Sequence, residues 1–341
     1  MRFQARIRNN FGETTMKRRV LLQSGLAACA VLSHAGVAMS QTAFPNKSIT
    51  MVVPFPPGGL ADLVARPVAE AMSRDLGQPV VIENKGGAGG GIGMAQVAKA
   101  RPDGYTVLMA LSSLTVIPQA DGLMGRSPMF TLPELKAVAR FTADPTVLAV
   151  RADAPWKNLQ DFIADAKKRP GALNFGSSGN YGTMHVPMEM LKASAGVHLV
   201  HIPYTGAGPA IVALLGNQID AVATGPATVL QHMKAGRVRV LGHWGLSNLA
   251  SMPEVPSLKA QGQNIDYAQW SGLFVPAGVP QPVAERLRAA ARMAAQDARV
   301  REVIQGAGSP LQYLDAPEFE LYVAADAKRM EDVVKRIGKL Q

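Results

Sequence analysis

The sequence has little of what thiol and metal chemistry require. It contains one cysteine, Cys29, and six histidines in 341 residues. A single thiol cannot close a disulfide within the chain, and a structural zinc site needs four clustered ligands. His198 and His201 are three apart in a predicted strand, so their side chains point to opposite faces. Neither a disulfide framework nor a metal site is predicted.

Aromatic and charged residues are also scarce, at 6% and 18% of the chain. Glycine (33) and proline (24) are plentiful, and 48% of the residues are hydrophobic. This composition favours an α/β chain with many tight turns over a β-sandwich or a helix bundle. A chain of this length can divide into more than one folded lobe.

The net charge of +10 does not come from a concentrated cluster of Lys and Arg. Half of it comes from the first 40 residues, which hold six Lys and Arg against one Glu. The densest later run, Lys167-Lys168-Arg169, has no interleaved aromatics and is typical of a solvated helix end. Nucleic-acid binding is therefore not expected.

Residues 1–41 have the pattern of an export signal peptide. The basic segment Met16-Lys17-Arg18-Arg19 precedes an apolar run from Val20 to Leu32, and small residues follow up to Ser40. The apolar run is shorter than the ~20 residues that a spanning helix needs. We expect cleavage near residue 41 and a periplasmic protein, with Met16 as a candidate start of translation.

Two variants of this signal stay open. Arg18-Arg19 followed by apolar residues is similar to a twin-arginine signal, which exports folded proteins. Leu26-Ala27-Ala28-Cys29 is similar to a lipobox, but the sequence after Cys29 stays apolar until a second cleavage site. We therefore favour a cleaved signal peptide over a lipoprotein.

The pattern strand, turn, helix recurs along the chain. The apolar run Ile49–Val53 ends in a Pro- and Gly-rich turn, and apolar residues at helical spacing follow from Asp62. A similar unit begins at Leu173 and passes through a Gly- and Ser-rich turn into a helix. Strands of this kind, each followed by a helix, predict parallel sheets.

The long extended stretch 138–150 is interpreted as a crossover between two lobes. The C-terminal helices are expected to pack back on the first lobe, so the chain would cross twice and form a hinge with a cleft. We predict a first lobe of residues 42–143 plus 244–341 and a second lobe of residues 144–243.

The two Gly-rich turns, residues 54–62 and 176–183, each place free backbone amides at the start of a helix without a nearby Lys or Arg. A small carboxylate held between two helix N-termini needs no ion pair. Asp62 either caps its own helix or selects a ligand with an amino group. Asn180 and Tyr181 are expected to rim the site and to read the rest of the ligand.

A nucleotide-binding interpretation and an enzymatic interpretation compete with this one. The stretch 86–93 fits neither a dinucleotide fingerprint nor a P-loop, so it is interpreted as a tight or flexible connection. An exported serine hydrolase could use Ser178 with His185 and Asp220, but the nucleophile elbow needs a glycine where Asn180 stands. A non-catalytic binding protein is favoured, with the hydrolase as the alternative.

Motifs over nearly all of the chain after residue 43 carry a family resemblance. They are Phe44-Pro45-x-Lys47-x-Ile49, Val53-Pro54-Phe55-Pro56-Pro57-Gly58-Gly59-x-x-Asp62, Leu76-Gly77-Gln78-Pro79-Val80-Val81-Ile82-Glu83-Asn84, Pro102-Asp103-Gly104-Tyr105-Thr106, His201-Ile202-Pro203-Tyr204-x-Gly206 and Trp270-x-Gly272-Leu273. Together they resemble the Bug (TctC-like) periplasmic receptors of tripartite tricarboxylate transporters.

This resemblance implies a type II periplasmic-binding-protein fold, with two α/β lobes, a two-strand hinge and a ligand cleft. It implies no cofactor and a receptor that binds a small carboxylate (a di- or tricarboxylate, an aromatic acid or an amino acid) and delivers it to integral membrane transporter subunits. We expect the receptor to be a monomer. A stand-alone ligand sensor is a further alternative. The expected ligand-binding residues are Phe55, Pro57, Gly58, Gly59, Asp62, Ser177, Ser178, Gly179, Asn180, Tyr181, Thr183 and Tyr204.

Overall fold

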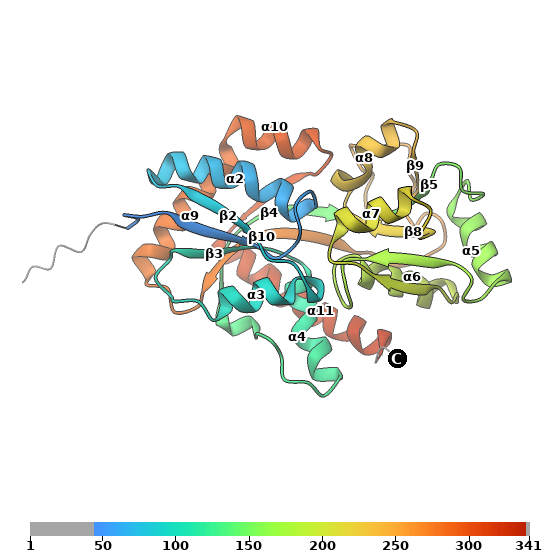
Figure 1. Cartoon of the computed structure of the whole chain (residues 1–341), viewed down its shortest axis with the longest axis horizontal. Helices are drawn as coiled ribbons and strands as arrows, with labels where there is room; N and C mark the ends of the chain where they lie inside the picture. Colours follow the sequence, from blue (N-terminus) through green and yellow to red (C-terminus); the bar gives the residue numbers. More distant parts are fainter. Residues whose placement is uncertain (1–43, 339–341) are drawn as a thin grey trace, which may run out of the picture. The chain divides into compact units, whose positions relative to one another are not determined.

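Two β-sheets organise residues 44–338, the part of the chain that the computed structural model describes (Figure 1). The six-stranded sheet has the order β11-β4-β10-β3-β1-β2, and the five-stranded sheet has the order β7-β6-β8-β5-β9. We call each sheet with its covering helices the first and the second lobe. The first sheet comprises β1 (Ile49–Val53), β2 (Val80–Asn84), β3 (Thr106–Leu111), β4 (Leu135–Pro145), β10 (Ala268–Pro276) and β11 (Leu311–Asp315). The second comprises β5 (Val147–Arg151), β6 (Asn174–Ser177), β7 (Val200–Pro203), β8 (Ala221–Thr224) and β9 (Val238–His243).

Helices cover both faces of each sheet (Figure 1). In the first lobe, α2 (Leu60–Leu76), α9 (Gln281–Gln296) and α10 (Ala298–Gly306) cover one face, and α3 (Gly91–Ala98), α4 (Ser113–Leu123) and α11 (Ala316–Ile337) cover the other. In the second lobe, α5 (Leu159–Lys168) and α6 (His185–Ala195) lie opposite α7 (Ala207–Leu215) and α8 (Pro226–Lys234). Short 3₁₀ turns occur at Ala88–Gly90 (η1) and Leu132–Glu134 (η2).

Strands buried on both faces explain the continuous apolar runs in the sequence. In β1, Ile49, Met51 and Val53 pack under α2, whereas Val52 packs on the opposite face. The period of two places alternate side chains in two separate cores. Helix α2 ends at Gly77, whose left-handed φ of 68° lets its N–H bond the Ser73 carbonyl.

The sheets are mixed rather than purely parallel, which corrects the sequence expectation. β1 is parallel to β2 and β3, but β10 is antiparallel to both β3 and β4. The reason is topological, because the chain leaves the first lobe along β4 and returns along β10. In the second sheet, β6 is parallel to β7 and β8, whereas β5 is antiparallel to β8 and β9.

The two crossovers lie side by side and are hydrogen-bonded. β4 continues through Thr146 into β5, and residues 244–267 lead from β9 back to β10. The Trp244 N–H donates to the Thr146 carbonyl at 2.8 Å, and the Tyr267 N–H donates to the Trp244 carbonyl at 3.1 Å. The stretch 138–150 thus crosses between the sheets, and the predicted two-lobed α/β fold is confirmed.

The residue boundaries of the predicted lobes stay a prediction. Within residues 244–267, Trp244 and Leu258 share a core with Leu148 of the second sheet. Met330 and Val334 of α11 join that same core, although α11 also covers the first sheet. The returning segment and the last helix therefore contact both lobes.

The predicted signal peptide, residues 1–41, lies outside the described residues. Between residues 44 and 338, no helix is both long and apolar enough to cross a membrane.

Candidate ligand-binding cleft

The first pocket loop, residues 54–59, connects β1 to α2. Its prolines exclude both strand pairing and an early helix start, because they lack an N–H and restrict the preceding residue. Gly58 has a φ of 88°, which favours glycine, and Gly59 is the N-cap residue of α2. The loop therefore ends with the free amides of a helix start.

Asp62 holds this loop in place from the first turn of α2. Its Oδ2 accepts hydrogen bonds from the Gly58 N–H at 3.1 Å and from Arg66 Nε at 2.9 Å. Its Oδ1 accepts from Arg66 Nη2 at 2.9 Å and from Asn84 Nδ2 at 3.0 Å. Asn84 also donates to the Phe55 carbonyl at 3.0 Å. One carboxylate thus ties the loop to α2 and to the end of β2.

These contacts fix the charge of Asp62. Burial would raise the pKa of its carboxyl, but the hydrogen bonds from Arg66, Asn84 and the Gly58 N–H outweigh burial and hold the pKa below its ordinary value. The ionised carboxylate uses both oxygens within the protein. The N-cap residue of α2 is Gly59, which has no side-chain cap hydrogen bond, so Asp62 anchors the loop rather than capping the helix as predicted. A ligand contact of Asp62 stays a prediction.

The second pocket loop, residues 178–184, connects β6 to α6 and is held by neutral groups. The Ser177 hydroxyl donates to the Gly179 carbonyl at 3.2 Å and accepts from the Gly179 N–H at 3.0 Å. His201 Nε2 lies 2.5 Å from the same hydroxyl. Which of these two atoms donates is set by the tautomer of His201.

His185 supports the middle of this loop. Its Nδ1 accepts the Tyr181 N–H at 3.0 Å, and its Nε2 lies 3.4 Å from Glu189. Tyr181 has a left-handed φ of 56°, and its hydroxyl donates to the Gly338 carbonyl at 2.7 Å. Tyr181 is therefore buried between the loop and the end of α11.

The electrostatics around His201 keep its imidazole neutral. Burial, followed by the neighbouring His185, lowers the pKa of His201 to about 3. The two rings lie 4.2 Å apart, so a charge on both would be repulsive. Glu189 opposes this shift without cancelling it. At neutral pH the contact between His201 and Ser177 is therefore an uncharged hydrogen bond.

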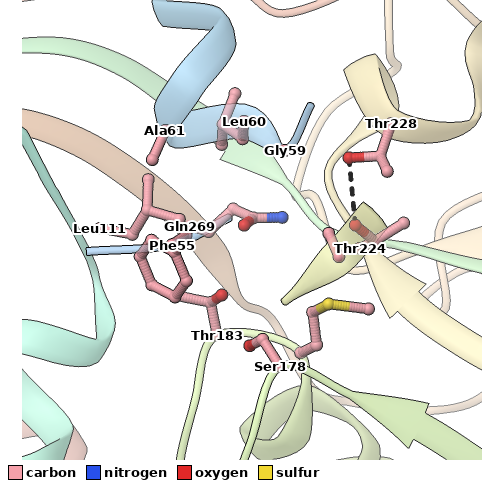
Figure 2. Close-up of a pocket in the computed structure, with 12 residues that line it drawn as sticks. Phe55, Gly59, Leu60, Ala61, Leu111, Ser178, Thr183, Thr224, Thr228 and Gln269 are labelled. Carbon is pink, nitrogen blue, oxygen red and sulfur yellow. Dashed lines mark hydrogen bonds between the residues drawn. The ribbon is translucent and has the colours of Figure 1, made fainter. Parts of the chain in front are cut away.

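A small pocket lies between the two loops (Figure 2). Its free space is about 20 Å³, close to what one water molecule needs. The first lobe contributes mainly apolar side chains and the second lobe mainly hydroxyls. The lining consists of Phe55, Gly59, Leu60, Ala61, Leu111, Ser178, Thr183, Met184, Ala207, Thr224, Thr228 and Gln269. None of these twelve residues carries an ionisable side chain.

Glycines allow the lobes to touch on two sides of the pocket. A Cβ atom on Gly89 would lie 3.1 Å from the Asn180 carbonyl oxygen and 3.3 Å from the Gly182 Cα. A Cβ atom on Gly206 would lie 2.6 Å from Pro56 Cδ. The stretch 86–93 is thus a turn that contacts the second pocket loop, not merely a connection.

The structure brings four of the predicted site residues to the pocket: Phe55, Gly59, Ser178 and Thr183. Others support the loops instead, as described for Gly58, Asp62, Ser177, Gly179 and Tyr181. Pro57 and Asn180 are exposed, and Tyr204 is partly buried with its N–H on the Ser177 carbonyl. The ligand contacts of all twelve remain predictions.

The sequence reasoning missed most of the pocket wall. Thr224 and Thr228 flank the start of α8 at a third strand-to-helix turn, where Gly225-Pro226 was an available signal. Ala207 begins α7, and Met184 is the N-cap residue of α6. Gln269 lies inside β10 and has no local pattern that marks it.

The predicted hydrolase arrangement is not assembled here. Within residues 44–338, the Ser178 hydroxyl is buried without a hydrogen-bond partner. His185 Nδ1 is used by Tyr181, and Asp220 accepts from the Asn174 N–H. The same part of the chain has no group of three or more His, Cys, Asp or Glu residues that could hold a metal ion.

Comparisons with known proteins find receptors and binding proteins that are similar to this chain. The model of the tripartite tricarboxylate transporter family receptor matches residues 64–339. Protein BugT of Bordetella pertussis is 32% identical over 90% of this chain and 95% of its own length. The periplasmic binding protein BugD has a TM-score of 0.81 at 29% identity, covering 87% of this chain and 99% of its own. MatC of Rhodopseudomonas palustris with bound malate has a TM-score of 0.80 at 29% identity, covering 85% of this chain and 100% of its own.

Proposed function

Because this chain belongs to the tripartite tricarboxylate transporter receptor family, whose members are periplasmic solute-binding receptors, we propose that it captures a small carboxylate between its lobes. We further propose that it delivers this ligand to integral membrane subunits of such a transporter. The ligand would be held mainly by backbone amides of the two pocket loops, with Phe55, Gly59, Ser178 and Thr183 against it.

The observation that carries this proposal is the convergence of helix starts on one uncharged pocket. The lining includes Leu60 and Ala61 at the start of α2, Met184 before α6 and Ala207 at the start of α7. Thr224 and Thr228 flank the start of α8. Helix N-termini present free N–H groups and the positive end of the helix dipole. Such a pocket favours an anion without a Lys or Arg partner.

Malate bound to MatC supports a carboxylate as the ligand class. The contacts of the two serines support binding rather than catalysis. Ser178 has no hydrogen-bonded base among the described residues, and Ser177, which contacts His201, is fully buried and already bonded to Gly179. A nucleophile needs both an activating base and access to substrate.

A thermal-shift screen tests this function directly. Small mono-, di- and tricarboxylates are added to the purified protein, with the matching primary amides as uncharged controls. A ligand at 100 times its Kd contributes about 2.7 kcal/mol of stability, so the melting temperature should rise with one or more acids and with none of the amides. No shift with any acid, or time-dependent loss of an ester substrate that Ser178→Ala abolishes, would contradict the proposal.

Periplasmic location by a cleaved signal peptide is also proposed. Intact-mass measurement of the protein from the periplasm should give a chain that begins near residue 41. A mass that corresponds to a diacylated Cys29 terminus would instead establish a lipoprotein.

A further inference from the structure

Two polar atoms in the pocket lack a partner within the described chain. They are the Ser178 hydroxyl oxygen and Gln269 Nε2, and their residues are 3% and 2% exposed. Both residues line the same pocket. Buried N–H and O–H groups are nearly always hydrogen-bonded, because leaving one unpaired forfeits its interaction with water. These two atoms therefore mark places where a ligand can supply hydrogen-bond partners.

Gln269 reaches the pocket from the crossover strand β10. A Cβ atom built on Gly225, which precedes α8, would lie 3.0 Å from Gln269 Nε2 and 3.7 Å from Leu60 Cδ2. The amide of Gln269 thus extends from the first sheet to the start of a second-lobe helix. Figure 2 shows its nitrogen directed toward Thr224, across the space between the lobes.

The neighbouring polar groups do not satisfy this amide. The Thr224 hydroxyl donates to the Thr228 hydroxyl at 3.3 Å. The other groups around Gln269 include the apolar side chains of Leu60, Leu111 and Phe55. A ligand oxygen placed among them would receive the Gln269 N–H in surroundings shielded from water, where a hydrogen bond discriminates strongly.

The pocket is better suited to a neutral oxygen at this point than to a second carboxylate. None of the twelve lining residues is a cation, and a buried carboxylate without a charged partner or several donors is costly. A hydroxyl or keto oxygen needs only one donor. An ammonium group would find no carboxylate in the lining.

We propose that Gln269 is the specificity-determining residue of this receptor and that its amide selects short monocarboxylates bearing a hydroxyl or keto oxygen. This inference rests on the proposed function, since the helix starts hold the carboxylate. Ser178 is the second unpaired donor in the lining of the same pocket. With the carboxylate held at the helix starts, an oxygen beyond it is the group that would accept from Gln269.

Calorimetric titration of matched acids tests the proposal. Propionate is compared with lactate and pyruvate, and butyrate with 3-hydroxybutyrate, using the wild-type protein and Gln269→Leu. The wild type should bind the oxygenated acid of at least one pair about tenfold tighter or more. Gln269→Leu should bring that ratio close to one while leaving the parent acid's affinity within about twofold. Gln281→Leu, on the exposed start of α9, is the matched control and should keep the wild-type ratio.

The outcomes separate this inference from the proposed function. If acids bind but the ratio is the same in Gln269→Leu, or the wild type prefers dicarboxylates, the role of Gln269 is overturned and carboxylate capture stands. If the wild type binds no carboxylate, both fail. Circular dichroism checks the folding of Gln269→Leu. If that variant does not fold, Gln269→Asn, which withdraws the amide by one methylene, must lower the ratio for the proposal to stand.

Discussion

The two pocket loops face the same small space but are held by opposite chemistry. The first is tied down by a carboxylate, Asp62, with Arg66 and Asn84 as charged and polar donors. The second is held by two imidazoles and a hydroxyl, through His185, His201 and Ser177, and the imidazole of His201 is neutral. The first loop thus depends on an ionised carboxylate, whereas the second depends on side chains that include a neutral imidazole. The two loops should consequently respond differently to substitution and to pH.

Removing the Asp62 carboxylate should have the largest effect. Asp62→Ala deletes four hydrogen bonds, which leaves the Gly58 N–H without its acceptor and Asn84 with the Phe55 carbonyl alone. We expect a loss of about 2–3 kcal/mol in the free energy of unfolding, and weaker binding of every ligand alike. Urea unfolding and calorimetry measure both. Asp62→Asn keeps one acceptor and should lose less, and equal losses in the two variants would argue against the carboxylate as the anchor.

Substituting His185, which supports the second loop, should lower the free energy of unfolding by less than Asp62→Ala does. His185→Leu removes the acceptor of the Tyr181 N–H, and we expect a loss of about 1–2 kcal/mol with reduced affinity. His185→Asn can return an acceptor oxygen near the Nδ1 position and should recover most of the affinity. Unchanged binding in His185→Leu would show that this contact does not hold the loop.

Lowering the pH should destabilise the second pocket loop, through His201, and leave the contribution of Asp62 to the first loop unchanged. The folded pKa of His201 is about 3, against an ordinary value of 6.5. Below pH 6.5 the unfolded chain therefore gains a proton that the folded chain does not, and stability falls as the pH drops toward 3. The pKa of Asp62 is lowered, so its contribution persists at any pH above 3.8.

His201→Gln is the variant that isolates this effect. It can keep a donor near Ser177 but cannot titrate, so its stability should fall by about 1–2 kcal/mol less than that of the wild type between about pH 7 and pH 5. Urea midpoints at both pH values measure the difference. His198→Asn is the control, because His198 is exposed and lies outside both loops, so its removal should leave the pH profile close to that of the wild type. Identical pH profiles for wild type and His201→Gln would refute a neutral His201.

The smallest loss in the free energy of unfolding should come from substituting Arg66, the exposed partner of Asp62. About half of the Arg66 side chain is exposed, so its ion pair with Asp62 is partly screened by solvent. Arg66→Ala should cost about 0.5–1 kcal/mol, well below the effect of Asp62→Ala. Salt titration of the wild type should reproduce part of this loss. A cost as large as that of Asp62→Ala would place the anchor in the ion pair rather than in the loop hydrogen bonds.

The sequence predicts the elements better than the contacts between them. The strands near Ile49 and Leu173 and their Gly-rich turns follow from apolar periodicity and turn residues. The role of Tyr181 does not, because it depends on its contact with Gly338, 157 positions away. The place of Gln269 in the pocket cannot be predicted from the sequence either, because only the pairing of β10 with β3 and β4 brings that residue beside the pocket loops.

Closure of the lobes on the ligand is the central claim, and small-angle X-ray scattering of wild type and Gly206→Ala tests it most directly. Gly206 has an extended backbone that alanine can adopt, and its new methyl would meet Pro56 of the opposite lobe only in the closed form. With a saturating carboxylate from the thermal-shift screen, the wild type should become more compact. Gly206→Ala should keep its free-state size and bind about tenfold or more weakly. Full compaction and unchanged affinity in Gly206→Ala, or no compaction in the wild type, would contradict a ligand held between the two lobes.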